Sequence, residues 1–190
     1  GLQYQLAVHG LGRKHDVQAG RVGAFEDLKS AARICREIDM PFGTATVVSH
    51  GNLEDLDEIL RWCVGAGSGH ILLIRFNPRS GSDIENVLGA GEYLDMVMAG
   101  ERAFLNYGIP VSLGLPHPAG VFEGEKIEHV SAGKCTAGVD SFAVAPDGAV
   151  RMCGHSRRVL GRVEDGVDAW RRAARELVKP TELEIRTYGK

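Results

Sequence analysis

Two cysteines and a histidine frame a short segment near the carboxyl end of the sequence. Cys135 precedes this segment, Cys153 closes it, and His155 follows. Between the cysteines, two short alternating stretches are joined by Asp147-Gly148, a pair typical of tight hairpin turns. A hairpin brings its ends together, so both thiolates, with His155 as a third ligand, could bind a soft metal ion or an iron–sulfur cluster. Alternatively, Cys135 and Cys153 are two free thiols, or they form a disulfide with each other.

Other residues capable of chemistry lie where short apolar runs end. They are His9, Ser49, His50, Arg75 and His117. If these runs are parallel strands, their carboxyl ends share one edge, where barrels place their active sites. Three histidines at such a mouth could bind zinc or iron, although solvated loop histidines are the simpler interpretation of the pattern. His9, Ser49 and Arg75 are the candidates for contacting a cofactor there, and Arg75 could hold a carboxylate or phosphate or form a structural ion pair.

The elements that would position these residues alternate between strand and helix. Apolar runs predict strands at 4–9, 44–49, 70–75 and 111–114, and helical stripes predict helices at 25–39, from Asn52 onward, and at 93–107. This alternation indicates parallel strands with right-handed crossovers. Four such units make an incomplete (βα) barrel, half of an eight-stranded one. Because a half barrel leaves strand flanks unpaired, we expect a homodimer or a second chain to complete it.

Some residue types in these elements have a simpler structural interpretation. Cys35 and Cys63 fall on the apolar stripes of the first two helices and are predicted to be buried core thiols. His15 and Asp16 are adjacent in a glycine-rich loop and could form an acid–base pair, although such neighbours are common in loops.

The character of the sequence changes after Pro116. We expect a domain of residues 1–118 and a smaller module of residues 119–190, in which a β-hairpin is followed by an amphipathic helix anchored by Trp170. The net charge of -3 gives no reason to expect nucleic acid or an anionic membrane as partner. No apolar run approaches the ~20 residues that cross a bilayer. No secretory signal is visible, which predicts a cytoplasmic protein.

The hairpin segment resembles a known module. Its sequence pattern consists of Cys135-Thr-Ala-Gly, Ala-Pro-Asp147-Gly-Ala-Val-Arg-Met-Cys153, Leu160-Gly-Arg-Val and Ala169-Trp170. This pattern resembles the opening of a SPASM or Twitch domain, the auxiliary-cluster module of radical S-adenosylmethionine (SAM) enzymes that modify peptides and proteins. The half barrel resembles the last βα units of the radical SAM core, with Leu6–Asp16, Thr46–Asn52 and Arg75–Gly81 similar to its fourth, fifth and sixth strands and their loops.

The sequence departs from this family at positions that serve radical chemistry. The family's Cys-x-x-x-Cys-x-x-Cys loop and its first three βα units do not occur in these 190 residues. Ala7 and His9 stand where the fourth strand of the family carries Ser and Asp, and Ala19 stands where an Arg precedes glycine. The later SPASM cysteines are also missing, so the ligand set for an auxiliary cluster is incomplete.

The resemblance implies a radical SAM/SPASM-like protein without its own radical-generating cluster, with an accessory or peptide-binding role in peptide modification. One alternative is the C-terminal fragment or split subunit of an active peptide maturase. Another is a dimeric, metal-binding half barrel with its own chemistry at His9, His50 and His117. An iron–sulfur cluster remains compatible with Cys135, Cys153 and His155, whereas this chain alone is not expected to bind SAM.

Overall fold

The computed structural model describes residues 4–78, 81–114, 124–132, 137–154 and 156–177. The chain forms two compact units, residues 1–133 and residues 134–190, and each is described by itself.

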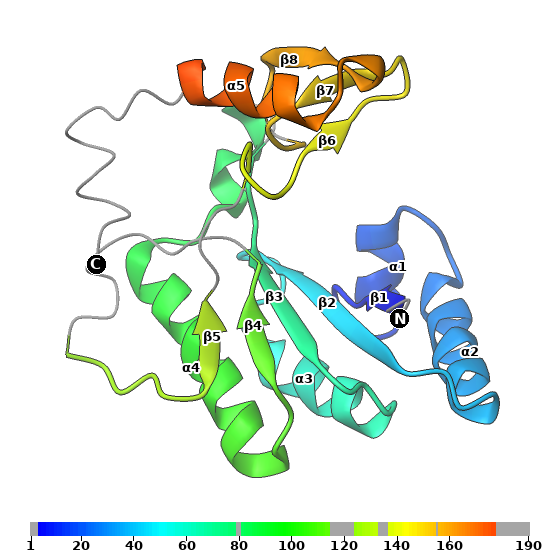
Figure 1. Cartoon of the computed structure of the whole chain (residues 1–190). Coiled ribbons are helices and arrows are strands. Elements are labelled where there is room, and N and C mark those ends of the chain that lie inside the picture. Colours follow the sequence, from blue (N-terminus) through cyan, green and yellow to red (C-terminus); the bar gives the residue numbers. More distant parts are fainter. Residues whose placement is uncertain (1–3, 79–80, 115–123, 133–136, 155, 178–190) are drawn as a thin grey trace. The chain divides into compact units, whose positions relative to one another are not determined.

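The first unit is built on a five-stranded sheet. Its strands are β1 (Tyr4–Ala7), β2 (Phe42–Val48), β3 (Ile71–Arg75), β4 (Val111–Leu113) and β5 (Val130–Ala132). They lie in sequential order, and every neighbouring pair is parallel (Figure 1). A strand order that never reverses is typical of barrels rather than of doubly wound sheets. The predicted α/β class and incomplete barrel are therefore confirmed.

Helices connect the strands and cover one face of this sheet. They are α1 (Arg13–Ala19), α2 (Ala24–Glu37), α3 (Leu56–Gly65) and α4 (Ala90–Tyr107), with a 3-10 turn, η1, at Gly81–Asn86. Within the described residues, no helix is long and apolar enough to cross a membrane.

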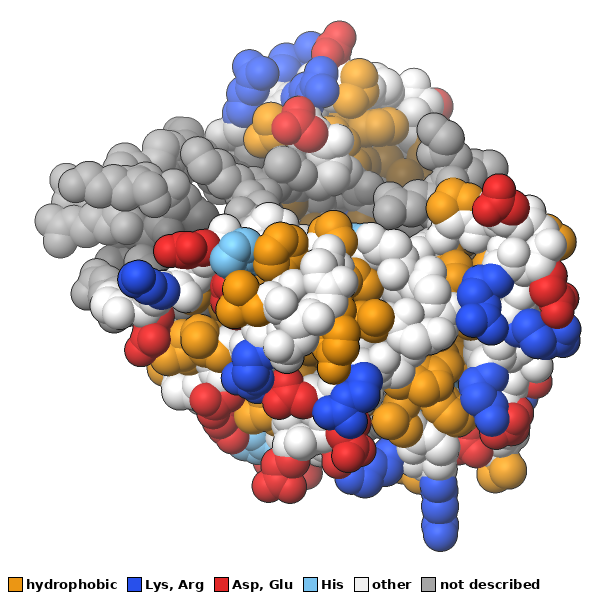
Figure 2. All heavy atoms as spheres, turned by 90° about the horizontal axis from the view of Figure 1, so that it is seen from below, with side chains coloured by type: hydrophobic (Ala, Val, Ile, Leu, Met, Phe, Trp, Pro, Cys, Tyr) orange, Lys and Arg blue, Asp and Glu red, His pale blue; other side chains and the backbone are white. Residues whose placement is uncertain are grey.

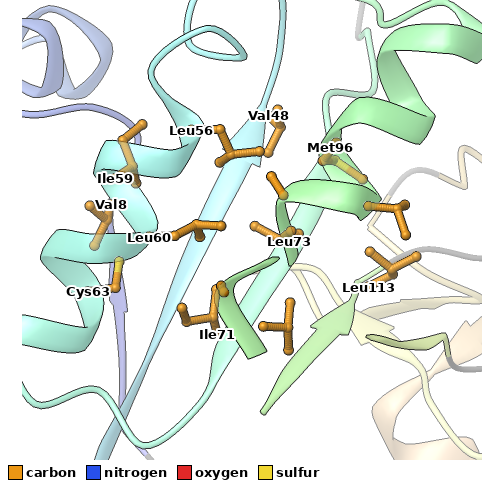
Figure 3. Close-up of a cluster of buried hydrophobic side chains, with 14 of the residues drawn as sticks. Val8, Val48, Leu56, Ile59, Leu60, Cys63, Ile71, Leu73, Met96 and Leu113 are labelled. Atoms are coloured by element: carbon orange, nitrogen blue, oxygen red, sulfur yellow. The ribbon is translucent and has the colours of Figure 1, made fainter. Parts of the chain in front are cut away.

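The core of the first unit lies between the sheet and helices α3 and α4. Val48 and Leu73 from the strands meet Ile59 of α3 and Met96 of α4, and all four side chains are fully buried (Figure 3). Each such burial contributes about 1.5–3 kcal/mol. Because side chains alternate along a strand, Val47 and its partner Ile74 on β3 point to the other face of the sheet, where they are only half-buried.

Three elements differ from the sequence-based expectation. Residues 13–19, expected in a glycine-rich loop, form α1. The helix expected from Asn52 begins at Leu56. Strand β5 was not expected, because Val130–Ala132 lies in the stretch after Pro116 that contains no clear apolar run.

The second unit contains the predicted hairpin. Strands β6 (Ala143–Val144) and β7 (Ala149–Arg151) are antiparallel, and β8 (Val159–Arg162) pairs with the other edge of β7. Gly148 adopts a φ of 82°, which favours glycine, and Asp147 Oδ1 accepts the amide N–H of Ala149 at 3.1 Å. A 3-10 turn, η2 (Val163–Asp165), and α5 (Val167–Leu177) complete the unit.

The exposed charges are mixed in sign. On the face shown in Figure 2, Lys and Arg side chains lie interspersed with Asp and Glu side chains and with apolar groups. Several form ion pairs, such as Arg33 with Glu37 and Arg102 with Asp57. Screened pairs of this kind stabilise a fold by about 0–1 kcal/mol each.

Candidate functional site

The carboxyl ends of β1 and β2 are held together by one buried amide. Asn52, 3% exposed, donates from Nδ2 to the carbonyl oxygens of His9 and Val47, at 3.0 and 2.9 Å. Its Oδ1 accepts the amide N–H of Ser49 at 2.9 Å. A helix was expected to begin at Asn52, but the structure shows that Asn52 precedes the helix and joins the carboxyl ends of two strands.

The ring of His9 is fixed by the same strand ends. The amide N–H of Val47 donates to His9 Nδ1 at 3.1 Å, so the neutral ring carries its proton on Nε2. The amide N–H of His9 donates to Nδ1 of the buried His15 at 3.3 Å, and the two rings are stacked 6.3 Å apart. Burial, followed by the neighbouring His15, lowers the pKa of His9, and burial lowers that of His15. Both rings are therefore neutral at pH 7.

A pocket opens beside His9. It has a volume of about 290 Å³ and is lined by His9, Arg13, Lys14, Val17, Gln18 and Gly51. Four of these residues lie on α1, which was not expected from the sequence, so the pocket could not be anticipated. Lys14 forms an ion pair with Asp55 at its rim.

Asp16 has a structural role. Its two carboxylate oxygens accept the amide N–H groups of Gly23 and Phe25, both at 2.8 Å, at the beginning of α2. These two hydrogen bonds lower the pKa of Asp16 and hold it ionised. Because both oxygens are engaged at the helix start, the pairing with His15 as acid and base finds no support in this geometry.

His50 lies in a different environment from His9. Its Nε2 is 2.8 Å from Glu92 Oε2, and Glu92 also accepts the amide N–H of Gly89 at the beginning of α4. The bond from Gly89 and then that to His50 lower the pKa of Glu92. Among the described residues, no group of three or more His, Cys, Asp or Glu side chains is placed to hold a metal ion. His117 lies outside the described residues.

Ser49 and Arg75 occupy different faces of the sheet. Ser49 is 6% exposed and follows β2 directly. Arg75 is in register with Val48, whose side chain faces the helices, and Arg75 Nε is buried with no hydrogen-bond partner among the described residues. The register therefore directs Arg75 toward α4, whereas His9 lines the pocket at the strand ends.

The predicted cysteine site is only partly described. Cys153 is a partly exposed free thiol in the turn after β7, where its carbonyl accepts the amide N–H of Ser156 at 3.1 Å. Cys135 and His155 lie outside the described residues. The binding of a metal ion or cluster by these three residues stays a prediction. Cys35 and Cys63 are buried, as expected for core thiols, and burial raises the pKa of Cys63 to about 11.

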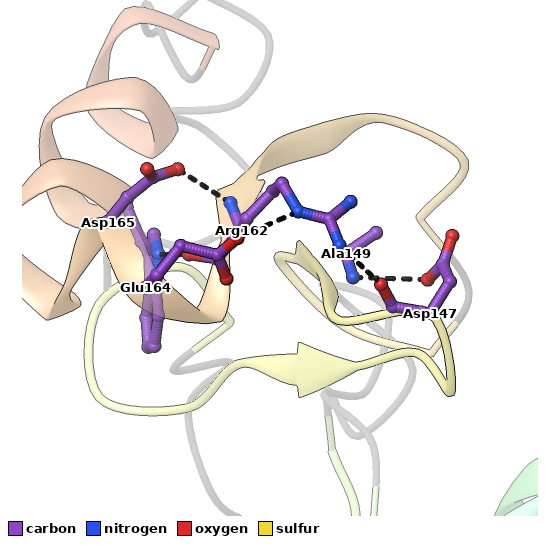
Figure 4. A network of polar contacts seen from close by, with 6 residues as sticks. Asp147, Ala149, Arg162, Glu164 and Asp165 are labelled. Carbon is purple, nitrogen blue, oxygen red and sulfur yellow. Dashed lines mark hydrogen bonds and ion pairs between the residues drawn. The ribbon is translucent and has the colours of Figure 1, made fainter.

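The Leu-Gly and Trp elements of the motif pack together in the second unit. Trp170 Nε1 donates to the carbonyl of Arg162 at 2.7 Å, and its ring contacts Phe142 edge-on at 5.6 Å. A Cβ at Gly161 would lie 2.7 Å from Asp165 Oδ2, so a larger residue would displace that carboxylate. Arg162, which the sequence did not single out, bonds to Asp147, Glu164 and Asp165 (Figure 4).

Comparison with known proteins supports the fold. No family model matches the sequence, and no curated protein matches it either. The structure of native anSMEcpe with bound AdoMet (SAM) matches with a TM-score of 0.58 and 18% identity, over 98% of this chain and 52% of that chain. Native anSMEcpe with bound AdoMet and Kp18Cys peptide matches with a TM-score of 0.62 and 17% identity, over 93% and 53%.

This chain therefore shares its fold, an incomplete α/β barrel, with the parts of the anSMEcpe structures that it covers. At this level of identity the likeness establishes the fold alone. The chain spans about half the length of the solved structures that it matches.

Proposed function

We propose that this chain is a radical SAM/SPASM-like protein that binds a peptide and has an accessory role in peptide modification, without a radical-generating cluster of its own. The observation that carries the proposal is the likeness to anSMEcpe over 93% of this chain, in a structure that holds a peptide. Parallel barrels place ligands at the carboxyl ends of their strands. The loops that follow β1 and β2, joined by Asn52, are therefore the surface to which we assign peptide contact.

The residues of this chain do not fit the cofactors of the radical enzymes. A reducible cluster needs several thiolates, and the four cysteines of these 190 residues do not have the Cys-x-x-x-Cys-x-x-Cys spacing. Where the resemblance implies Ser and Asp near SAM, Ala7 has no polar side-chain atom, and His9 uses Nδ1 to accept a backbone N–H. A carboxylate for SAM is therefore missing from these two positions.

A second candidate function is the C-terminal half of a split or longer peptide maturase. Two observations favour it: the match to about half of anSMEcpe and the position of β1 at the edge of the sheet. A further parallel strand, from a second copy or another chain, could pair with that edge. In this case the complementary half would supply the cluster and the SAM site.

The auxiliary site is part of the same proposal. We assign Cys135, Cys153 and His155, which flank the hairpin in the sequence, to a shared metal or iron–sulfur site. Anaerobic reconstitution followed by iron analysis and a visible spectrum tests it. We expect Cys135→Ala and Cys153→Ala each to abolish the bound metal and Cys63→Ala, the control, to retain it. Metal retained by both of the first two variants would reject the site.

The non-radical role is tested on the reconstituted chain under reducing, anaerobic conditions. Labelled Kp18Cys peptide serves as a probe in fluorescence anisotropy, and 5′-deoxyadenosine is measured after addition of SAM and dithionite. We expect peptide binding that does not depend on SAM, and no 5′-deoxyadenosine. Formation of 5′-deoxyadenosine by the chain alone would refute the non-radical role. Its formation only after addition of a complementary half would favour the split enzyme.

A further inference from the structure

The pocket beside His9 presents hydrogen-bond donors from two directions. Backbone contacts fix the His9 ring, because Nδ1 accepts the amide N–H of Val47 and the carbonyl of His9 accepts from Asn52. With Nδ1 engaged, the other ring nitrogen, Nε2, is the donor that His9 can offer to a ligand in the pocket. A donor held in place by packing and backbone bonds loses little freedom when a ligand binds.

Helix α1 supplies the opposite side of the pocket. Arg13 and Gln18 line it, and both side chains are exposed rather than packed into the core. A Cβ at Gly51 would lie 3.7 Å from both Gln18 Nε2 and Ser49 Oγ, so these two polar groups flank the glycine. The side-chain amide of Gln18 and the hydroxyl of Ser49 thus lie near Gly51, which lines the pocket together with His9.

The charges of the pocket favour an anion. Lys14 is paired with Asp55, but no carboxylate among the described residues pairs with Arg13. The lining residues include no Asp or Glu. One uncompensated guanidinium, together with neutral donors from His9 and Gln18, matches a group that bears a single negative charge and two acceptor oxygens.

We propose that this pocket binds a carboxylate group, with Arg13 and the Nε2–H of His9 as its principal donors. A volume of about 290 Å³ suits a small acid or the end of a larger molecule. The carboxylate can belong to a free small acid or to the carboxyl terminus of a peptide. The second source would tie the pocket to the proposed function, whereas the first would not.

The test uses the full chain labelled with ¹⁵N, and it follows the imidazole resonances of His9 during titration. Acetate is compared with acetamide, which has a similar shape but no charge. N-acetylglycine is compared with N-acetylglycinamide as a model of a peptide terminus. We expect both acids to shift the Nε2 resonance of His9, with saturation on the order of 10 mM or below, and both amides to leave it in place.

A variant on the exposed side of α1 tests the Arg13 donor without disturbing the strand ends. Arg13→Gln removes the guanidinium, and Arg33→Gln is a matched control on α2, where Arg33 pairs with Glu37 outside the pocket. We expect Arg13→Gln to weaken acetate binding about tenfold and Arg33→Gln to change it less than about twofold.

Three results would overturn the proposal: no shift of the His9 resonance with either acid, equal shifts with acids and amides, or equal weakening in the two arginine variants. Tighter binding of N-acetylglycine than of acetate would identify a peptide terminus as the source of the carboxylate. Equal binding of the two acids would identify a free small acid. Neither of these outcomes depends on whether Kp18Cys peptide binds, so failure of the proposed function remains distinguishable.

Discussion

A single buried amide organises the mouth of the half barrel. In the sequence, Asn52 resembles a helix cap, because it precedes an acidic stretch and a helical stripe. In the structure, its two donors and one acceptor satisfy backbone groups at and just beyond the carboxyl ends of β1 and β2. Buried backbone groups that lose such partners cost about 1–3 kcal/mol each, so this residue has a larger effect than an ordinary cap.

Replacement of Asn52 is expected to destabilise the first unit. We expect Asn52→Ala to lower the free energy of unfolding by about 2–4 kcal/mol, because three backbone groups lose their partner. Asn52→Asp, which keeps the acceptor and loses both N–H donors, is also expected to be destabilised. Urea denaturation followed by circular dichroism gives the values, with Asn106→Ala on the exposed side of α4 as control. An Asn52→Ala variant as stable as this control would show that water replaces the amide.

Helix α4 approaches strands β4 and β5 closely at one glycine. A Cβ at Gly100 would lie 2.9 Å from Val130 Cγ2 and 3.1 Å from Val111 Cγ1. Both neighbours are strand side chains in or against the core, so they have little room to move. The glycine is therefore required by packing rather than by backbone conformation.

Two alanine substitutions on the same helix separate packing from helix propensity. We expect Gly100→Ala to destabilise the protein by about 1–3 kcal/mol, because the added methyl group overpacks the interface. Gly91→Ala meets no atom within 4 Å, so we expect it to be neutral or to stabilise by up to about 1 kcal/mol. Thermal denaturation of both variants measures the difference. Similar melting temperatures would mean that α4 shifts to accommodate the methyl group.

Strand β5 is attached to α4 by a buried carboxylate. Glu101, 4% exposed, accepts the amide N–H groups of His129 and Val130, both at 2.8 Å, and its other oxygen lies 2.9 Å from His129 Nδ1. Burial by itself would raise the pKa of Glu101, but the bonds from Val130 and His129 outweigh burial and lower it. The ionised form is therefore favoured by folding.

This shift predicts how stability changes with pH. Since the folded pKa of Glu101 lies below its unfolded value, near 4.3, its contribution is complete above the unfolded pKa. The contribution is lost as the pH falls through the folded pKa. We expect Glu101→Gln to be destabilised by about 1–2 kcal/mol at pH 5 and the deficit to shrink toward pH 3. Urea denaturation across this range measures it, with the exposed Glu128→Gln as control. A deficit that is constant with pH would contradict the ionised form of Glu101.

The sequence predicted those elements that carry a local signal. Helices α2 and α4, the first four strands and the hairpin of the second unit were all predicted, because periodicity and the Asp147-Gly148 turn are local signals. Strand β5 was missed, because it depends on Glu101, which lies 29 residues before Val130. Helix α1 was missed, because glycines at positions 10, 12 and 20 surround it. The position of His9 at a strand end was predicted, but Arg13 and Gln18 depended on α1 and were missed.

On the scale of the whole molecule, the two units differ in how much apolar surface they bury. Nearly all of the buried hydrophobic residues described lie in the first unit, and only Ala149, Val150 and Ala174 lie in the second. A unit with so small a core gains little from apolar burial. Its hairpin, the Arg162 network and the Trp170 contacts are then the main described interactions that hold it together.

The two tryptophans report on the two units separately. Trp62 packs against the core of the first unit, and its ring lies 5.3 Å from that of Phe25, whereas Trp170 belongs to α5. The fluorescence of Trp170 is measured in the Trp62→Phe variant, and that of Trp62 in the Trp170→Phe variant. We expect the urea midpoint of the Trp170 fluorescence to be lower than that of the Trp62 fluorescence by on the order of 1 M. Circular dichroism of both variants is the control for an altered global midpoint. If the two tryptophan signals and the circular dichroism change together, the units unfold as one cooperative structure, and the small core of the second unit does not limit its stability.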